Sequence, residues 1–210
     1  MIDALATGID ALRLDVDQAA RQKLSTYLAL LDKWNRTHNL TAIREPARMI
    51  THHLLDSLAV LPHLPVRPGL HIVDVGSGGG LPGIPLAIAR PAWRVALIDS
   101  NRKKAAFLNQ AAIELPLANV EVVAARVEDY TPPAPFDVVI ARAYANLATF
   151  AAQARHLLAS GGQLVAMKGA HPREEIAQLP RGIRVVATTR LDVPGVDGER
   201  HLVIMQDVAS

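Results

Sequence analysis

The chain contains the sequence Ile72-Val73-Asp74-Val75-Gly76-Ser77-Gly78-Gly79-Gly80-Leu81-Pro82-Gly83, in which a β-branched apolar run passes directly into a glycine-rich loop. Glycines let the backbone turn sharply and let a ligand approach bare peptide groups. Proline near the end of the loop is compatible with the first turn of a following helix. Four glycines in the five residues 76–80 exceed what a tight turn requires. We therefore expect a buried strand followed by a ligand-binding loop.

Outward from this loop, short β-branched runs alternate with helical stretches, which is typical of βαβ units in a parallel sheet. We expect strands at residues 70–75, 94–98, 120–124, 136–141, 162–167, 183–188 and 201–206. We expect helices at residues 84–90, 102–114, 147–160 and 172–178. Since no helix separates the last two strands, they should run antiparallel. The predicted fold class is α/β, a Rossmann-like open sheet of seven strands that binds ligands beyond the carboxyl ends of its strands.

The first 65 residues have helical periodicity instead. Between residues 17 and 37, Leu24, Tyr27, Leu28, Leu31 and Trp34 recur at three- and four-residue steps on one helix face. We interpret Leu31 and Trp34 as core residues. A second helix is expected from residues 45–46 to residue 61, closed by the three prolines of residues 62–69. These features predict two domains, an N-terminal helical cap (1–65) and a Rossmann-like core (66–210).

Composition limits the classes of function. The 210 residues are 50% hydrophobic and 20% charged, which indicates a globular protein with a sizeable core. There is no cysteine, which excludes disulfides and thiolate nucleophiles. We expect no signal peptide and no membrane span, because the start of the chain is acidic and no apolar run approaches about 18 residues. The net charge is only +2, so a polyanionic partner would need a local basic patch.

Two ligands are compatible with the glycine loop. Residues 78–83 match the dinucleotide fingerprint G-x-G-x-x-G. However, Asp74 lies two residues before Gly76, where its carboxylate would repel a pyrophosphate and would suit a ligand that carries an ammonium and a sulfonium. S-adenosylmethionine carries both charges. We therefore favour S-adenosylmethionine, with Asp74, Gly76 and Gly78 at its binding site.

Further candidates follow the next strands. Asp99 is close to the offset expected for a carboxylate on ribose hydroxyls, although it could instead cap the helix at residue 102. Val127 and Glu128 follow the third strand, where an adenine ring would lie, or they begin a short helix. Arg142 follows the fourth strand and should point into the crevice, because an arginine there needs an anionic or π-system neighbour. We expect it to position the reacting groups.

The motifs occur in an order that resembles a known family. They are Lys33-Trp34-Asn35, Asn39-Leu40-Thr41, His53-Leu54-Leu55-Asp56-Ser57, residues 74–85, Leu97-Ile98-Asp99-Ser100, Lys103-Lys104, Arg126-Val127-Glu128, Ala141-Arg142-Ala143 and Lys168-Gly169. Together they resemble the ribosomal RNA small subunit methyltransferase G family, also called glucose-inhibited division protein B, of the class I S-adenosylmethionine-dependent methyltransferases. The resemblance covers about residues 20–170. The last 40 residues carry little of it.

The resemblance implies a bacterial cytoplasmic enzyme that methylates N7 of one guanine in 16S rRNA. The substrate would be 16S rRNA, the 30S subunit or an assembly intermediate, and we expect the enzyme to be a monomer. By the family pattern, five residues would contact the cofactor, with Asp99 on the ribose: Gly76, Leu81, Val127, Glu128 and Arg142.

The proposed chemistry agrees with what the sequence lacks. Guanine N7 has a free lone pair, so no base has to remove a proton, and no acid–base pair or catalytic triad is evident. Pyrimidine C5 methylation would require a cysteine, and methylation of an exocyclic amine usually relies on an Asn/Asp-Pro-Pro-aromatic loop where this chain has Ala141-Arg142-Ala143-Tyr144. We expect no metal site, and we interpret His52 and Asp56 as an i,i+4 surface pair.

RNA contacts are predicted less specifically. Tyr144 could stack on the target base or belong to the core. Arg102, Lys103, Lys104 and Lys168 could bind phosphates or be solvated surface charges. A small-molecule methyltransferase and a non-catalytic RNA- or ribosome-binding module remain as alternative functions.

Overall fold

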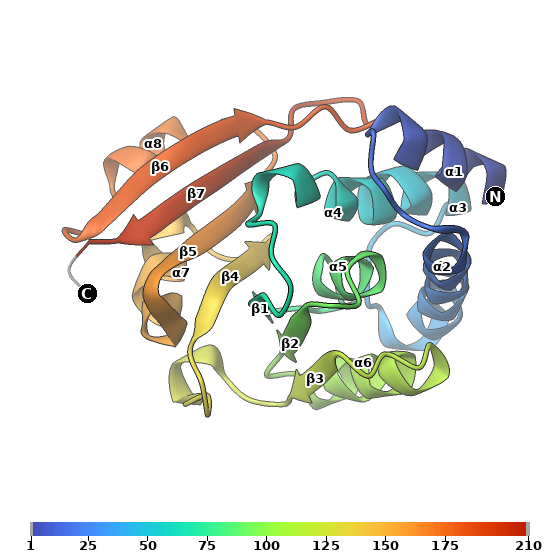
Figure 1. Ribbon diagram of the computed structural model, residues 1–210, viewed down its shortest axis with the longest axis horizontal. Coiled ribbons are helices and arrows are strands. Elements are labelled where there is room, and N and C mark those ends of the chain that lie inside the picture. Colours follow the sequence, from blue (N-terminus) through green and yellow to red (C-terminus); the bar gives the residue numbers. More distant parts are fainter. Residues whose placement is uncertain (1, 209–210) are drawn as a thin grey trace.

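The computed structural model describes residues 2–208, and its centre is one mixed sheet in the order β3-β2-β1-β4-β5-β7-β6 (Figure 1). The strands are β1 (His71–Val75), β2 (Arg94–Ile98), β3 (Val120–Val123), β4 (Phe136–Arg142), β5 (Leu158–Lys168), β6 (Ile183–Arg190) and β7 (His201–Asp207). The first five strands are parallel, and β7 is antiparallel to both β5 and β6. The predicted α/β fold with seven strands and an antiparallel final pair is confirmed. The sequence did not reveal that β7 lies between β5 and β6.

Helices cover both faces of this sheet. Figure 1 shows α7 and α8 on one side and the N-terminal helices with α5 and α6 on the other. The α-helices are α1 (Ile2–Ala11), α2 (Gln18–His38), α3 (Pro46–Met49), α4 (Asp56–Leu58), α5 (Gly83–Ala89), α6 (Arg102–Glu114), α7 (Leu147–Ala154) and α8 (Arg173–Ala177). The other helical segments are the π-helix η1 (Ile50–Leu55) and the 3-10 helices η2 (Leu61–His63), η3 (Val127–Asp129) and η4 (Arg155–Leu157).

The two faces of the sheet bury two separate apolar clusters, because successive residues of a strand point to opposite sides. Ile72 faces the N-terminal helices, whereas Val73 faces α7. Tyr27 and Leu58 belong to the same cluster as Ile72. Each fully buried side chain of this size contributes about 1.5–3 kcal/mol. The N-terminal helices therefore share the core of the sheet, and a domain boundary at residue 65 remains a prediction.

Local signals explain the long helix α2. The Asp17 carboxylate accepts a hydrogen bond from the Ala20 N–H (2.7 Å), and Asn39 ends the helix in the left-handed conformation. Leu31 is fully buried, so it is a core residue as predicted. Trp34 is partly buried and packs against the same cluster, with its ring centroid 5.6 Å from that of Phe107.

Three sequence-based expectations were wrong, and one helix was missed. Helix α7 ends at Ala154 rather than at residue 160, because Leu158 already pairs with Phe136 as part of β5. Helix α1 was not predicted, and Gly8 in its middle weakens the helical signal; there a Cβ would lie 2.3 Å from Leu55 Cδ1. The segment expected as one helix from residue 46 contains the π-helix η1, after which Asp56 is buried and not paired with His52 on the surface.

Candidate functional site

The glycine loop crosses the carboxyl end of β1 and leads into α5. The N–H groups of Gly76 and Ser77 both donate to the Ile98 carbonyl, at 2.8 and 3.0 Å, which ties the loop to β2. Gly76 has a φ of 68°, and a Cβ on it would lie 2.9 Å from the Tyr144 ring. From α2, the Tyr27 hydroxyl donates to the Gly79 carbonyl. Burial raises the pKa of Tyr27, which keeps this donor protonated.

Asp74 lies beneath this loop and is fully buried. Its Oδ2 accepts the Gly83 N–H at 2.8 Å, and its Oδ1 has no hydrogen-bond partner among residues 2–208. Burial, opposed by the Gly83 N–H and by Arg142, raises the pKa of Asp74 to about 7. The site therefore contains a buried acceptor atom that lacks a donor.

Asp99 follows β2 and holds the loop from the other side. Its Oδ2 accepts the Gly78 N–H at 2.9 Å and its Oδ1 accepts the Asn101 N–H at 2.8 Å. The side chain that caps α6 is Asn101, which accepts the Lys103 N–H at 2.9 Å. Capping of α6 is therefore not the role of Asp99.

A cavity of about 220 Å³ lies at the carboxyl ends of β1 and β2. Its lining includes four of the predicted cofactor residues, Gly76, Asp99, Val127 and Glu128, and also Tyr144, which was predicted for RNA. The Tyr144 hydroxyl donates to Gln153 Oε1 (2.9 Å), and Gln153 Nε2 donates to Glu128 Oε1 (2.6 Å). Gln153 was not predicted, because one glutamine on an otherwise small and apolar helix gives no functional signal.

The remaining predicted cofactor residues lie outside the lining of this cavity. Asp74 is below the loop, and the Gly78 N–H is bonded to Asp99. Leu81 packs into the apolar core. Their contacts with a cofactor remain predictions.

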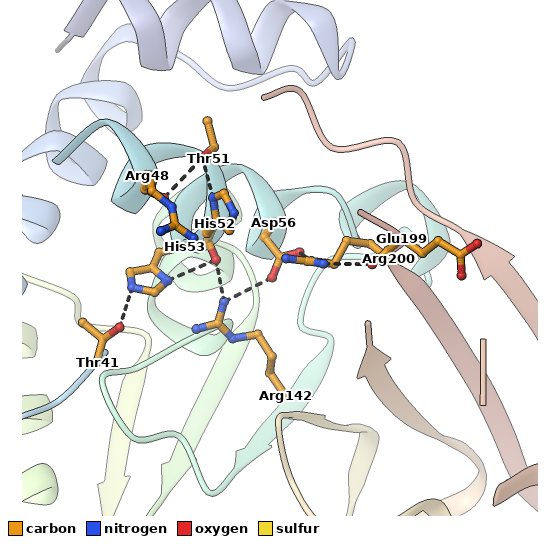
Figure 2. Close-up of polar contacts among 9 residues, drawn as sticks. All are labelled: Thr41, Arg48, Thr51, His52, His53, Asp56, Arg142, Glu199 and Arg200. Atoms are coloured by element: carbon orange, nitrogen blue, oxygen red, sulfur yellow. Dashed lines mark hydrogen bonds and ion pairs between the residues drawn. The ribbon is translucent and has the colours of Figure 1, made fainter. Parts of the chain in front are cut away.

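Arg142 points toward the N-terminal helices. Its Nη1 donates to the His52 carbonyl at 2.9 Å and to Asp56 Oδ2 at 3.1 Å (Figure 2). It lines a second cavity, of about 480 Å³, together with residues from the loop at 41–43, the π-helix η1, the strand ends of β4, β5 and β7, and the segment before β7. Arg142 thus lies beside the second cavity, not within the first.

A neutral histidine completes the wall of the second cavity. His53 Nδ1 lies 3.0 Å from the His52 carbonyl and Nε2 lies 2.8 Å from Thr41 Oγ1, as drawn in Figure 2. Burial and the neighbouring Arg142 lower the pKa of His53 to about 4. Nδ1 therefore carries the proton and Nε2 accepts from Thr41.

The residues predicted to bind RNA are divided by the structure. Tyr144 lines both cavities, and Lys168 lines the second, where it pairs with Glu175 at 2.7 Å. Arg102, Lys103 and Lys104 lie in the first turn of α6 and line neither cavity.

Residues 2–208 contain neither a membrane-spanning helix nor a cluster of metal ligands. No helix there combines the length and the apolar character that crossing a bilayer requires. No group of three or more acidic or histidine side chains there is placed to hold a metal ion.

The strand order, the glycine loop after β1 and the acid after β2 define a Rossmann-like methyltransferase. Solved structures of this class share the fold. A SAM-dependent methyltransferase from Aquifex aeolicus has a TM-score of 0.55 at 19% identity. The aligned region covers 86% of this chain and 98% of the Aquifex chain. TrmN from Thermus thermophilus has a TM-score of 0.57 at 21% identity and covers 72% of this chain and 48% of its own.

Sequence comparison identifies the family. The model of the GidB family, described as rRNA small subunit methyltransferase G, matches residues 20–203. The ribosomal RNA small subunit methyltransferase G of Nitrosospira multiformis is 53% identical over 96% of this chain and 95% of its own, and that of Pseudomonas paraeruginosa is 49% identical over 99% and 96%. The chain belongs to the rRNA small subunit methyltransferase G family. The match extends past residue 170, where the sequence-based resemblance ended.

Proposed function

We propose that this chain transfers a methyl group from S-adenosylmethionine to N7 of a guanine in 16S rRNA of the small ribosomal subunit, in the bacterial cytoplasm. Family membership and the methyltransferase fold support the reaction class. The observation that carries the proposal is Asp74 Oδ1, a buried acceptor that no donor of residues 2–208 satisfies. It lies under a glycine loop whose flanking cavity is lined by Asp99 and Glu128.

The chemistry of these residues fits S-adenosylmethionine. When bound, this cofactor supplies an electrophilic methyl group on a positively charged sulfonium. The carboxylates of Asp99 and Glu128 would hold the adenosine part, because carboxylates accept hydrogen bonds from ribose hydroxyls and from an amino group. Asp74 Oδ1 can accept one more hydrogen bond and would accept it from the cationic end of the cofactor. A positive charge at that place would in turn favour the ionised form of Asp74. Two carboxylates, Asp99 and Glu128, and one cationic side chain, Arg126, line the cavity, and Asp74 adds a further carboxyl group beneath the loop. This acidic balance disfavours a dinucleotide pyrophosphate.

The second cavity would hold the acceptor. Its one lining carboxylate, Asp56, already accepts hydrogen bonds from Arg142 and Arg200. His53 Nε2 already accepts from Thr41. These two groups are therefore poorly placed to act as a general base, which suits a nucleophile such as guanine N7 that has no proton to lose. Positioning of the base and methyl group would supply most of the rate, an effect worth about 7–11 kcal/mol in well-oriented systems.

The RNA must present its target base outside a regular helix, since N7 lies in the deep, narrow major groove of A-form RNA. Tyr144 lines both cavities, and we expect it to stack on such a base. We propose that the substrate is 16S rRNA, the 30S subunit or an assembly intermediate. We also propose that the enzyme is a monomer.

The decisive experiment maps modified nucleosides in 16S rRNA from cells with and without the gene. We expect one N7-methylguanosine to disappear on deletion and to return when purified protein and S-adenosylmethionine are added to the unmodified rRNA or subunit. An unchanged N7-methylguanosine profile would refute the proposal. Methylation of a nucleoside or other small molecule without RNA, insensitive to salt, would favour a small-molecule enzyme.

A further inference from the structure

The second cavity contains an arginine pair joined by one buried carboxylate. Asp56 Oδ2 accepts from Arg142 Nη1 and Asp56 Oδ1 accepts from Arg200 Nε, both at 3.1 Å (Figure 2). The Asp56 side chain is 6% exposed, whereas those of Arg142 and Arg200 are 20% and 26% exposed. The carboxylate is thus inside the wall, and the two guanidinium groups are partly open to the cavity.

Three distant segments of the chain build this pair. Arg142 ends β4, Arg200 directly precedes β7, and Asp56 follows the π-helix η1. The Arg142 guanidinium is further fixed by the His52 carbonyl, which belongs to the π-helix and also faces His53 Nδ1. A π-helical turn is uncommon and occurs often at functional sites. Here it places one carbonyl and one carboxylate against the same guanidinium.

Both arginines keep donors for a ligand. The hydrogen bonds of Arg142 within residues 2–208 all use Nη1, so Nε and Nη2 remain available. Those of Arg200 use Nε and Nη1, which leaves Nη2. Both guanidinium groups meet one carboxylate and line the same cavity, so the cavity borders two arginines at once. A guanidinium fork matches phosphate oxygens in geometry and charge.

The charge of the cavity favours an anion. Its lining contains three cationic side chains, Arg142, Lys168 and Arg200, and one carboxylate, Asp56. Glu175 neutralises Lys168 from outside the lining. The trio of Asp56 and two arginines therefore has a net charge of +1. Since both oxygens of Asp56 are engaged, the carboxylate itself is not free to read the edge of a base.

We propose that Asp56 is a positioning residue that presents Arg142 and Arg200 together to a phosphate of the RNA beside the target nucleotide. This inference rests on the proposed function, since it assigns the second cavity to the RNA acceptor. If Asp56 only stabilised the fold, its substitution would lower the amount of active protein. If Asp56 positions the arginines, its substitution lowers the affinity of the folded protein for RNA.

The test compares Asp56→Asn, Arg200→Gln and the double variant with the wild type. We expect each single variant to raise the KM for the RNA substrate about ten- to a hundredfold, the range for one charge-assisted hydrogen bond, with kcat little changed. We expect the slope of log affinity against log salt to fall by about one unit. Cofactor affinity should be unchanged in Arg200→Gln. The double variant should lose less than the product of the two single effects, because part of the effect of Asp56 is exerted through Arg200.

Asp207→Asn is the matched control. Asp207 is also a buried carboxylate that pairs with an arginine, Arg155, but it lies at the opposite end of β7. Its substitution should leave KM unchanged. A rise in KM for Asp207→Asn equal to that for Asp56→Asn would overturn the assignment.

Arg200→Gln keeps the inference testable even if Asp56→Asn fails to fold, because the Asp56–Arg142 pair remains in that variant. An unchanged KM for Arg200→Gln, or a loss confined to kcat, would overturn the proposal. RNA binding measured by filter retention, without methyl transfer, separates this result from failure of the proposed function. If the wild type binds RNA but modifies no guanine, the function is wrong, while the salt slopes still decide the role of Asp56.

Discussion

Asp74→Asn should make the protein more stable and a weaker binder of its cofactor, and the gain in stability should depend on pH. The folded protein raises the pKa of Asp74 from 3.8 to about 7, chiefly through burial. The folded state therefore binds the proton of Asp74 more tightly than the unfolded state does, and ionisation of Asp74 lowers the free energy of unfolding. The stability that this group contributes is complete below pH 3.8 and is lost as the pH rises toward 7.

The size of the effect follows from the shift. About three pKa units at 1.36 kcal/mol each give at most about 4 kcal/mol, lost between pH 4 and pH 7. Asparagine has nearly the same shape and can still accept the Gly83 N–H through its amide oxygen, but it cannot ionise. The free energy of unfolding of Asp74→Asn, minus that of the wild type, should therefore rise with pH across this window and stay level above it.

Urea or thermal unfolding of both proteins at several pH values between 4 and 8.5, without cofactor, measures this difference. The acidic end of the series is the internal control, since both side chains are neutral there. Added cofactor should narrow the difference at pH 8, because the wild type gains more binding energy. A stability difference that does not change with pH would refute the reasoning about Asp74, whatever the effect on binding.

The remaining predictions concern the loop and the walls of the cavities. Asp99→Ala should weaken cofactor binding by about ten- to a hundredfold, through loss of about 1.5–3 kcal/mol, and calorimetry showing unchanged affinity would contradict the ribose role. Gly76→Ala should cost about 1–2 kcal/mol of stability because φ is 68°, and its Cβ should displace the Tyr144 ring; a crystal structure with Tyr144 unmoved would disprove the second part. Thr41→Ala leaves His53 Nε2 without its donor and should lower the free energy of unfolding by about 1–3 kcal/mol, whereas an unchanged urea midpoint would show that another donor replaces it.

Much of the sheet could be predicted because its signals are local. β2 and α6 occupy the predicted residues, since a β-branched run and a helix with a polar N-terminal residue at Asn101 are visible in short windows. The acids at the ends of β1 and β2, Asp74 and Asp99, were found because parallel strands bring their carboxyl ends to one edge. In the structure, Gly76, Asp99, Val127 and Glu128 accordingly line one cavity at this edge of the sheet.

What the sequence could not show depends on contacts between distant segments. Asp56 and Arg200 are 144 positions apart, and no local pattern pairs them. The side of the sheet that Arg142 faces, by contrast, follows from the alternation of residues along β4. Val138 and Ile140 face the N-terminal helices, so Arg142, two residues further along β4, must face them as well. The alternation of the strand therefore places Arg142 on the side of Asp56, where the structure has it.

The same alternation separates the tasks of the two cavities. Val75 and Ile98, which line the smaller cavity, face α7, whereas Arg142 faces the N-terminal helices, so the two cavities open on opposite sides of the strand ends. Tyr144 lines both, and its ring lies against Gly76. If the cofactor binds in the smaller cavity and the RNA in the larger, the methyl group must pass from one cavity to the other beside Tyr144 and Gly76. Selectivity for the acceptor would then depend on the N-terminal helices and on the segment before β7, because these supply His53, Asp56 and Arg200 to the larger cavity.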